Sequence, residues 1–201
     1  EENAYFYNAN PSEYLFVGIP RVGKTLTPDL KLFSDLFKKA DSVIIGPGLG
    51  LDTYANYMLE FVLRTSTVPT VVDADALRLI AKDPALQQYL KKPNILLTPH
   101  FGEFCALANI TLDQLYEDTF AALENYVKKT EAKVLLKSDT TIFCDGKRMF
   151  INTSGNDGLA TGGSGDVLAG IIGSFCGQQM ELGEAAINAS YIMGKTAEEL
   201  A

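Results

Sequence analysis

Short apolar runs alternate with longer amphipathic segments along most of the chain. Runs rich in Val, Ile and Leu are typical of buried strands, and we assign strands to Tyr14–Gly18, Ser42–Gly46, Pro69–Asp73, Asn94–Thr98 and Lys133–Lys137. The segments between them carry apolar residues at helical spacing. We predict helices over Pro28–Ala40 with Thr27 as N-cap, over Asp52–Arg64, and from Thr111 to about Lys129 with Phe120 facing inward. This alternation predicts a doubly wound α/β sheet with parallel strands.

The pattern changes in the last third of the chain. Asp145-Gly146 is a hairpin turn signal between the segments Thr140–Cys144 and Arg148–Asn152, so we expect an antiparallel extension of the sheet. A glycine-rich loop and two helices follow, Asp166–Cys176 and about Glu181–Leu200. The second helix has an apolar stripe that predicts core packing, formed by Ala185, Ala186, Ala189, Ile192 and Met193. No repeat or linker divides the chain, and we expect one domain over residues 1–201.

Composition narrows the class of protein. Of the 201 residues, 47% are apolar and 21% are charged, which is typical of a globular chain and excludes disorder. The net charge of −8 argues against a nucleic-acid partner, and the apolar runs are too short to cross a membrane. Three cysteines without metal-ligand spacing favour a reducing compartment, so we expect a cytoplasmic protein. The chain has neither an initiator Met nor a signal-peptide pattern, and we expect a piece of a longer protein.

One phosphate-binding pattern near the start of the chain is misleading. Gly18–Thr25 fits the pattern GxxxxGK[ST] and follows an apolar run. A P-loop needs a helix that starts at its lysine, here Lys24, and Pro28 would then lie too deep in that helix. We therefore interpret Gly18–Thr27 as a surface loop.

A second glycine-rich segment is a stronger candidate for anion binding. Gly155–Gly165 leads directly into an apolar helix that begins near Asp166. Glycines let successive backbone amides turn toward one point, and the helix N-terminus adds its dipole, so we expect phosphate to bind here. A carboxylate repels phosphate, which favours Asp166 as a general base for a hydroxyl that attacks the phosphoryl group. The alternative is a flexible loop in which Asp166 caps the helix.

Further candidates follow the ends of the predicted strands, where ligands bind in open parallel sheets. His100 is the only histidine of the chain, and its place at a strand end favours a substrate contact. Glu103 lies within the first turn of the next helix and also suits a helix cap. Asp73 and Asp75 suit a helix start better than direct catalysis. Lys137 suits a phosphate contact as a point charge.

The glycine-rich segment resembles a known family signature. GNDGLATGGSGDVLAGII, residues 155–172, is similar to the anion-hole signature of the ribokinase-like superfamily, and more specifically of the NAD(P)H-hydrate dehydratases, the YjeF C-terminal domain family. Other motifs agree in order and spacing: Gly46–Gly50, Val72–Leu77, Leu97–Glu103 and Leu136–Thr141. The similarity extends from about Tyr14 to Ala201 and leaves out the family's N-terminal portion. It implies an α/β ribokinase-like three-layer sandwich, with a mostly parallel central sheet and helices on both faces.

The resemblance also implies a function. Members of this family repair hydrated NADH or NADPH as lyases: ADP or ATP, with Mg²⁺, phosphorylates the hydroxyl of the hydrate, and phosphate is then eliminated. Asp166 is the implied catalytic base. The implied nucleotide site comprises Lys137, Ser138, Asp139, Thr140, Thr141, Asn156, Asp157, Gly158, Leu159, Ala160, Thr161, Gly162, Gly163, Ser164 and Gly165. The implied substrate contacts are Gly50, His100, Phe101, Gly102, Glu103 and Asp166, and metal ligands are not assigned.

The chain departs from the family pattern at some positions, and other functions stay open. Phe101 and Asp157 replace prolines, Ser138 replaces a glycine, and Ser164 replaces a threonine while keeping its hydroxyl. The segment PHFGE favours ADP as the donor, and the family implies a homo-oligomer. The alternatives are a vitamin-precursor kinase for hydroxyethylthiazole or a hydroxymethylpyrimidine, a catalytically silent nucleotide-binding protein, and a P-loop NTPase that uses Lys24.

Overall fold

The computed structural model describes residues 17–19, 21–22, 27–28 and 30–201, and the chain divides into two compact units, residues 1–39 and 40–201. In the first unit, β1 (Arg21–Val22) pairs antiparallel with β2 (Thr27–Pro28), and α2 (Leu30–Phe37) follows. The helix start expected at Thr27 is therefore wrong, because strand pairing holds Thr27 and Pro28 in an extended conformation. The expected strand Tyr14–Gly18 and the pattern Gly18–Thr25 lie largely outside the described residues, and the single domain stays a prediction.

The second unit is built on a six-stranded sheet with the order β3-β4-β5-β6-β7-β8. Its first four strands are mutually parallel, and the last two form an antiparallel hairpin at one edge. The mostly parallel sheet and its antiparallel extension are thereby confirmed. The strands are β3 (Val43–Ile45), β4 (Thr70–Val72), β5 (Ile95–Leu97), β6 (Lys133–Leu136), β7 (Thr141–Cys144) and β8 (Met149–Asn152).

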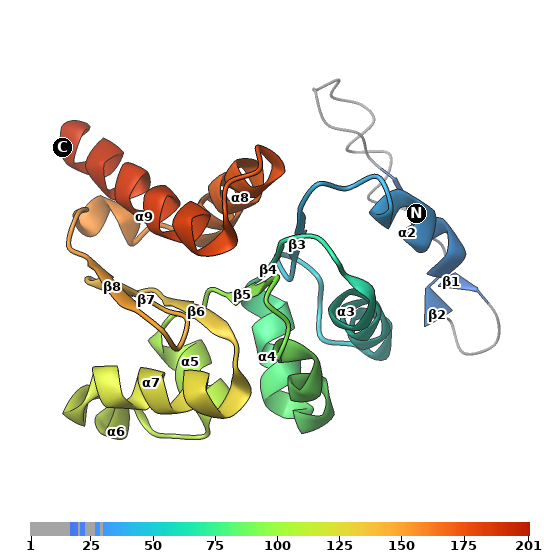
Figure 1. Ribbon diagram of the computed structural model, residues 1–201, viewed down its shortest axis with the longest axis horizontal. Coiled ribbons are helices and arrows are strands. Elements are labelled where there is room, and N and C mark those ends of the chain that lie inside the picture. The colour runs from blue at the N-terminus through green and yellow to red at the C-terminus, as the bar shows by residue number, and fades with distance from the viewer. Residues whose placement is uncertain (1–16, 20, 23–26, 29) are drawn as a thin grey trace. The chain divides into compact units, whose positions relative to one another are not determined.

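Helices cover both faces of this sheet, as the three-layer prediction requires (Figure 1). One face carries α8 (Ser164–Gly177) and α9 (Leu182–Glu199). The other face carries α4 (Ala74–Lys82), α5 (Phe101–Ala108) and α7 (Thr119–Thr130). The remaining elements are α3 (Thr53–Thr65), α6 (Leu112–Glu117) and two 3₁₀ turns, η1 (Pro84–Leu90) and η2 (Asp157–Leu159).

Side chains at the helix starts decide where the helices begin. Asp52 caps α3 and Glu181 caps α9, close to the predicted boundaries. Thr111 caps α6 as expected, but a single helix from Thr111 to Lys129 is wrong. The backbone leaves the helical conformation at Asp118, whose carboxylate then caps α7. Phe120 is 47% exposed near the start of that second helix, and the inward position expected for it is also wrong.

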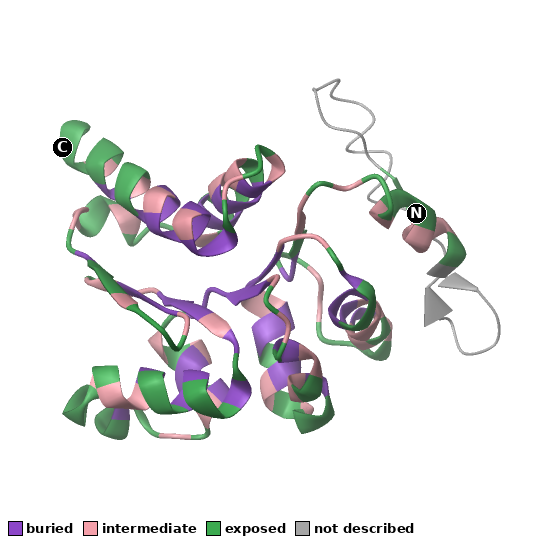
Figure 2. Cartoon of the chain, in the orientation of Figure 1, coloured by how far each residue is buried: buried purple, intermediate pink, exposed green. Residues whose placement is uncertain are grey.

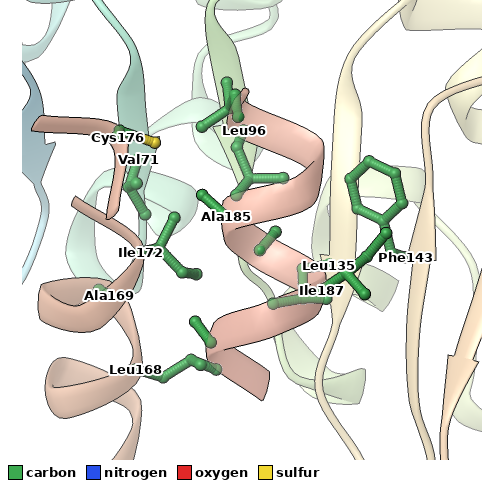
Figure 3. Packing of buried hydrophobic residues seen from close by; sticks show 13 residues of the cluster. Val71, Leu96, Leu135, Phe143, Leu168, Ala169, Ile172, Cys176, Ala185 and Ile187 are labelled. Atoms are coloured by element: carbon green, nitrogen blue, oxygen red, sulfur yellow. The ribbon is translucent and has the colours of Figure 1, made fainter. Parts of the chain in front are cut away.

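The core on the α8 and α9 side of the sheet is apolar (Figure 3). Leucine and valine side chains of the central strands pack against the two helices, and the buried positions follow the sheet and the inner sides of the helices (Figure 2). The apolar stripe expected on α9 is confirmed for its three alanines, since Ala185, Ala186 and Ala189 are fully buried. Met193 packs against this cluster, whereas Ile192 is 45% exposed and does not belong to the core.

The three cysteines, Cys105, Cys144 and Cys176, are free and buried. Burial, with the nearby Glu181 carboxylate, raises the pKa of the Cys176 thiol to about 11. In the described part of the chain, the helices are too short or too polar to span a membrane. The cytoplasmic location stays a prediction.

A buried tyrosine hydroxyl provides a test of the packing between α5 and α7. The ring of Tyr126 packs edge-on against that of Phe104, with centroids 5.4 Å apart, and its hydroxyl has no hydrogen-bond partner among the described residues. Tyr126→Phe removes this unpaired group, and we expect the free energy of unfolding to rise by about 1 kcal/mol. Chemical denaturation measures it. The control Tyr116→Phe, at a position 67% exposed, leaves the midpoint unchanged, and a lower stability of Tyr126→Phe contradicts the packing.

Candidate functional site

The carboxyl ends of the four parallel strands meet at one edge of the sheet, where open α/β sheets bind their ligands. Backbone hydrogen bonds tie the segments that leave neighbouring strands. The amide of Asp73 donates to the carbonyl of Ile45 at 3.0 Å, and the amide of Lys137 donates to the carbonyl of Pro99 at 2.8 Å. The motifs after β3, β4, β5 and β6, which are far apart in the sequence, therefore lie next to one another.

An ion pair joins two of these strand ends. Nζ of Lys137, after β6, donates to Oδ1 of Asp73, after β4, at 2.8 Å. The Asp73 side chain is 2% exposed and that of Lys137 is 20% exposed, so little water screens the pair. Asp73 was expected at a helix start, and it does precede α4, but its side chain makes no cap hydrogen bond. The lysine, which is 64 residues away in the sequence, takes that carboxylate instead.

The glycine-rich segment ends directly above this ion pair. Gly163 has a φ of +93°, a left-handed conformation that starts α8 at Ser164. A Cβ on Gly165 would lie 3.2 Å from Nζ of Lys137 and 3.6 Å from Oδ2 of Asp73. The ammonium group of Lys137 therefore lies against the first turn of α8. Asp166 is exposed in that first turn.

The earlier part of the glycine-rich segment is fixed to the end of α9. Asn156 Nδ2 donates to the carbonyl of Ala197 at 2.6 Å, and its Oδ1 accepts from the amide of Gly158 at 3.0 Å. The amide of Gly155 donates to the carboxylate of Glu198 at 2.8 Å. The start of the segment is thus tied to the last turns of α9. Its exposed middle part contains Asp157, Gly158, Ala160, Thr161, Gly162 and Gly163.

The turn between β6 and β7 carries the other expected nucleotide contacts. Ser138 Oγ donates to the carbonyl of Thr140 at 2.7 Å, and the amide of Thr140 donates to Oδ1 of Asp139 at 2.8 Å. Thr141 begins β7. The side chains of Ser138 and Asp139 thus shape the turn that follows Lys137.

A pocket of about 450 Å³ opens between α4 and α5 at the same edge. Three of the expected substrate contacts line it, namely His100, Gly102 and Glu103, together with Ala74, Asp75, Arg78 and Ala106. Gly50, Phe101 and Asp166 are not part of its lining. Because Ala74 follows Asp73 directly, the pocket adjoins the ion pair.

His100 and Glu103 form a capping box at the start of α5. Nδ1 of His100 accepts from the amide of Glu103 at 3.2 Å, and Oε2 of Glu103 accepts from the amide of His100 at 3.0 Å. The cap expected of Glu103 is confirmed. Since Nδ1 is the acceptor, the neutral ring carries its proton on Nε2, and the imidazole side chain is 60% exposed.

Two residues of the pocket were not singled out from the sequence for this role. Asp75 accepts from the amide of Gly50 at 3.0 Å and pairs with Arg78 at 3.2 Å, so it joins the loop after β3 to α4. The spacing of Asp75 and Arg78 by three positions was the available signal.

Phe101, one of the expected substrate contacts, lies against another side chain instead. Its ring packs against that of Tyr116, with ring centroids 5.5 Å apart.

The fold and this edge define an α/β protein of the ribokinase-like class, as solved structures show. A ribokinase-like superfamily protein from Enterococcus faecalis matches with a TM-score of 0.76 at 30% identity, over 86% of this chain and 60% of that chain. The ADP/ATP-dependent NAD(P)H-hydrate dehydratase of Bacillus subtilis, co-crystallized with ATP/Mg²⁺, matches with a TM-score of 0.67 at 26% identity, over 81% of this chain and 59% of that chain.

The sequence comparison identifies the family within that class. A family model for NAD(P)H-hydrate dehydratase matches residues 18–201, and the chain belongs to this family. The ADP-dependent (S)-NAD(P)H-hydrate dehydratase of Staphylococcus aureus is 34% identical over 175 residues, which cover 86% of this chain and 61% of that relative. The match to the bifunctional NAD(P)H-hydrate repair enzyme Nnr of Coxiella burnetii covers 33% of that relative. The chain thus spans between about a third and three fifths of these relatives.

The strand ends at this edge are packed closely, and alanine substitutions at two glycines test that packing. Gly46 has a φ of +127°, and a Cβ on it would lie 1.7 Å from the carbonyl oxygen of Asp73. We expect Gly46→Ala to lower the free energy of unfolding by more than about 3 kcal/mol. Gly48, with a φ of +63° and open space around a Cβ, is the matched control, and Gly48→Ala loses only about 1 kcal/mol. Equal losses in thermal unfolding contradict the close approach.

Proposed function

We propose that this protein dehydrates hydrated NADH or NADPH in a reaction that uses an adenine nucleotide. One observation carries the proposal: the glycine-rich start of α8 faces the Lys137 ammonium, next to a pocket lined by the family's histidine motif. The membership in the NAD(P)H-hydrate dehydratase family supports it. The relatives named above act as repair enzymes or ADP-dependent dehydratases by their names.

In this proposal the phosphates of the nucleotide bind to the segment Asn156–Gly165. The first turn of α8 offers backbone amides and the positive end of the helix dipole. Lys137 adds a positive charge against this turn. The turn Ser138–Thr141 flanks the nucleotide. ADP is the donor that we propose, as in the S. aureus relative.

The hydrated dinucleotide occupies the pocket between α4 and α5 in this proposal. His100 lines this pocket, and the capping box with Glu103 fixes its ring, with Nε2 3.6 Å from Oε1 of Glu103. Arg78 supplies a fixed positive charge for the anionic substrate, and Asp75 holds the guanidinium. Gly50 donates to Asp75 and thereby keeps the loop after β3 at the pocket.

Asp166 acts as the general base in the proposed mechanism. Its carboxylate takes the proton from the hydroxyl of the hydrate, and that oxygen attacks the terminal phosphoryl group of ADP. The bond from phosphorus to the leaving oxygen breaks, and AMP leaves. The C–O bond of the phosphorylated intermediate then breaks as phosphate departs, and loss of a ring proton restores the dihydronicotinamide. The protein supplies position and charge, because the ring chemistry belongs to the substrate.

The residues of the loop fit a magnesium ion carried by the nucleotide. Mg²⁺ in phosphoryl-transfer sites keeps several waters and takes one or two protein carboxylates besides the phosphates. The loop would offer such an ion the exposed carboxylate of Asp157, which leaves Asp166 free to act as the base. When bound, Mg²⁺ neutralises charge on the transferred phosphoryl group.

We also propose that the active protein is a cytoplasmic homo-oligomer.

Asp166→Asn tests the role of the base. We expect turnover to fall by about 10²- to 10⁴-fold, while the dissociation constant for ADP changes by less than about threefold. The assay mixes the protein with Mg²⁺, hydrated NADH and ADP, and follows the recovery of dihydronicotinamide absorbance. Asp113→Asn, which removes an exposed first-turn carboxylate from α6, is the matched control and keeps full turnover.

The products separate the proposed reaction from the rival ones. Free phosphate with restored dihydronicotinamide supports dehydration, whereas a stable phosphoester means a vitamin-precursor kinase. Nucleotide binding without turnover means a silent binding protein. Near-normal turnover of Asp166→Asn contradicts the role of this carboxylate as the general base.

Gly165→Ala tests whether the start of α8 binds the nucleotide. The added Cβ would press on the Lys137 ammonium at 3.2 Å, and we expect the ADP dissociation constant to rise about tenfold or more. Gly170→Ala is the control on the same helix, because a Cβ there meets open space. Isothermal titration calorimetry measures both. Equal affinity for the two variants places the phosphates away from this turn.

A further inference from the structure

The backbone around Asp73 is unusual in two respects. Ala74 has a φ of +48°, a left-handed conformation that is uncommon for residues other than glycine, asparagine and aspartate. On the other side, a Cβ on Gly46 would collide with the carbonyl oxygen of Asp73. Strained backbone persists where the surrounding structure requires it and gathers at functional sites. Asp73 therefore occupies a position that its neighbours accommodate at some cost.

The side chain of Asp73 also does not cap the helix that it precedes. An aspartate before a helix normally accepts from an amide of the first turn, which stabilises the helix. Asp73 is placed before α4 with extended backbone and makes no such bond. Its Oδ1 accepts from Lys137 Nζ instead. The fold forgoes a helix cap and keeps a carboxylate that is 2% exposed facing the lysine.

This arrangement matters because of where the ammonium group lies. Nζ of Lys137 is the group that a Cβ on Gly165 would meet first, at 3.2 Å, so the lysine reaches the first turn of α8. A lysine side chain is flexible, and a hydrogen bond to a buried carboxylate restricts it to one position. We propose that Asp73 is a positioning residue, which fixes the Lys137 ammonium beneath the anion-binding turn before the nucleotide arrives. This inference rests on the proposed nucleotide site.

Two opposite effects on nucleotide affinity make the inference testable. Asp73 is itself an anion close to the expected phosphates, so its charge alone weakens phosphate binding. If it positions Lys137, Asp73→Asn weakens ADP binding, although a negative charge has been removed. In a Lys137→Met background the carboxylate has nothing to position, and only its repulsion remains. Asp73→Asn then strengthens ADP binding, so the sign of the effect depends on the lysine.

The experiment is a double-mutant cycle on the intact protein, read by calorimetry with adenosine and ADP. We expect Asp73→Asn to raise the ADP dissociation constant about tenfold, and Lys137→Met to raise it up to about a hundredfold. The double variant binds ADP more tightly than Lys137→Met. Adenosine, which has no phosphate, binds equally to all four proteins, which separates positioning from a general loss of structure.

Asp145→Asn is the matched control, since it removes a carboxylate that pairs with Arg148 in the β7–β8 turn. It leaves ADP affinity unchanged. Unchanged or tighter ADP binding by Asp73→Asn overturns the inference, as does equal weakening with and without Lys137. Each single variant leaves one charge of the pair without its partner. The double variant removes both charges, so its ADP affinity is free of that effect and completes the cycle. A wild-type protein that binds no adenine nucleotide refutes the proposed function itself.

Discussion

The carboxylate of Asp73 is almost completely removed from water, and the Lys137 ammonium neutralises it at 2.8 Å. Leaving one such charge without its partner typically costs about 3–5 kcal/mol, so the two strand ends must keep their relative position. Asp73 follows β4 and Lys137 follows β6, with β5 between them. The pair therefore depends on the parallel register of three strands. The pair in turn places the Lys137 ammonium next to the start of α8, and the proposed nucleotide site depends on that positive charge.

The site is otherwise assembled from ordinary local structure. Glycine lets the chain turn sharply into α8, capping side chains begin α5 and α9, and the helix dipole provides part of the attraction for an anion. The same capping box that begins α5 fixes the tautomer of His100. Features that stabilise helix ends thus also supply binding groups of the proposed nucleotide site.

The sequence predicted most of the sheet, because buried parallel strands read as continuous Val, Ile and Leu runs such as Asn94–Thr98. The hairpin followed from Asp145-Gly146, whose turn chemistry is local. The break at Asp118 was missed because the apolar residues on both sides of it were assigned to one helical face, although Phe120 is exposed and the Asp118 carboxylate caps a second helix. The pairing of Asp73 with Lys137 was also missed. It links residues 64 positions apart, and no local pattern carries that information.

The most direct measurement is a crystal structure of the protein with ADP, Mg²⁺ and an unreactive analogue of the hydrate. The account predicts a terminal phosphate oxygen within about 3 Å of Lys137 Nζ and of amides at the start of α8. It also predicts the analogue between α4 and α5, with its hydroxyl directed at the carboxylate of Asp166. A nucleotide bound elsewhere on the chain, with Lys137 still paired to Asp73 and no ligand at the glycine-rich turn, would contradict it.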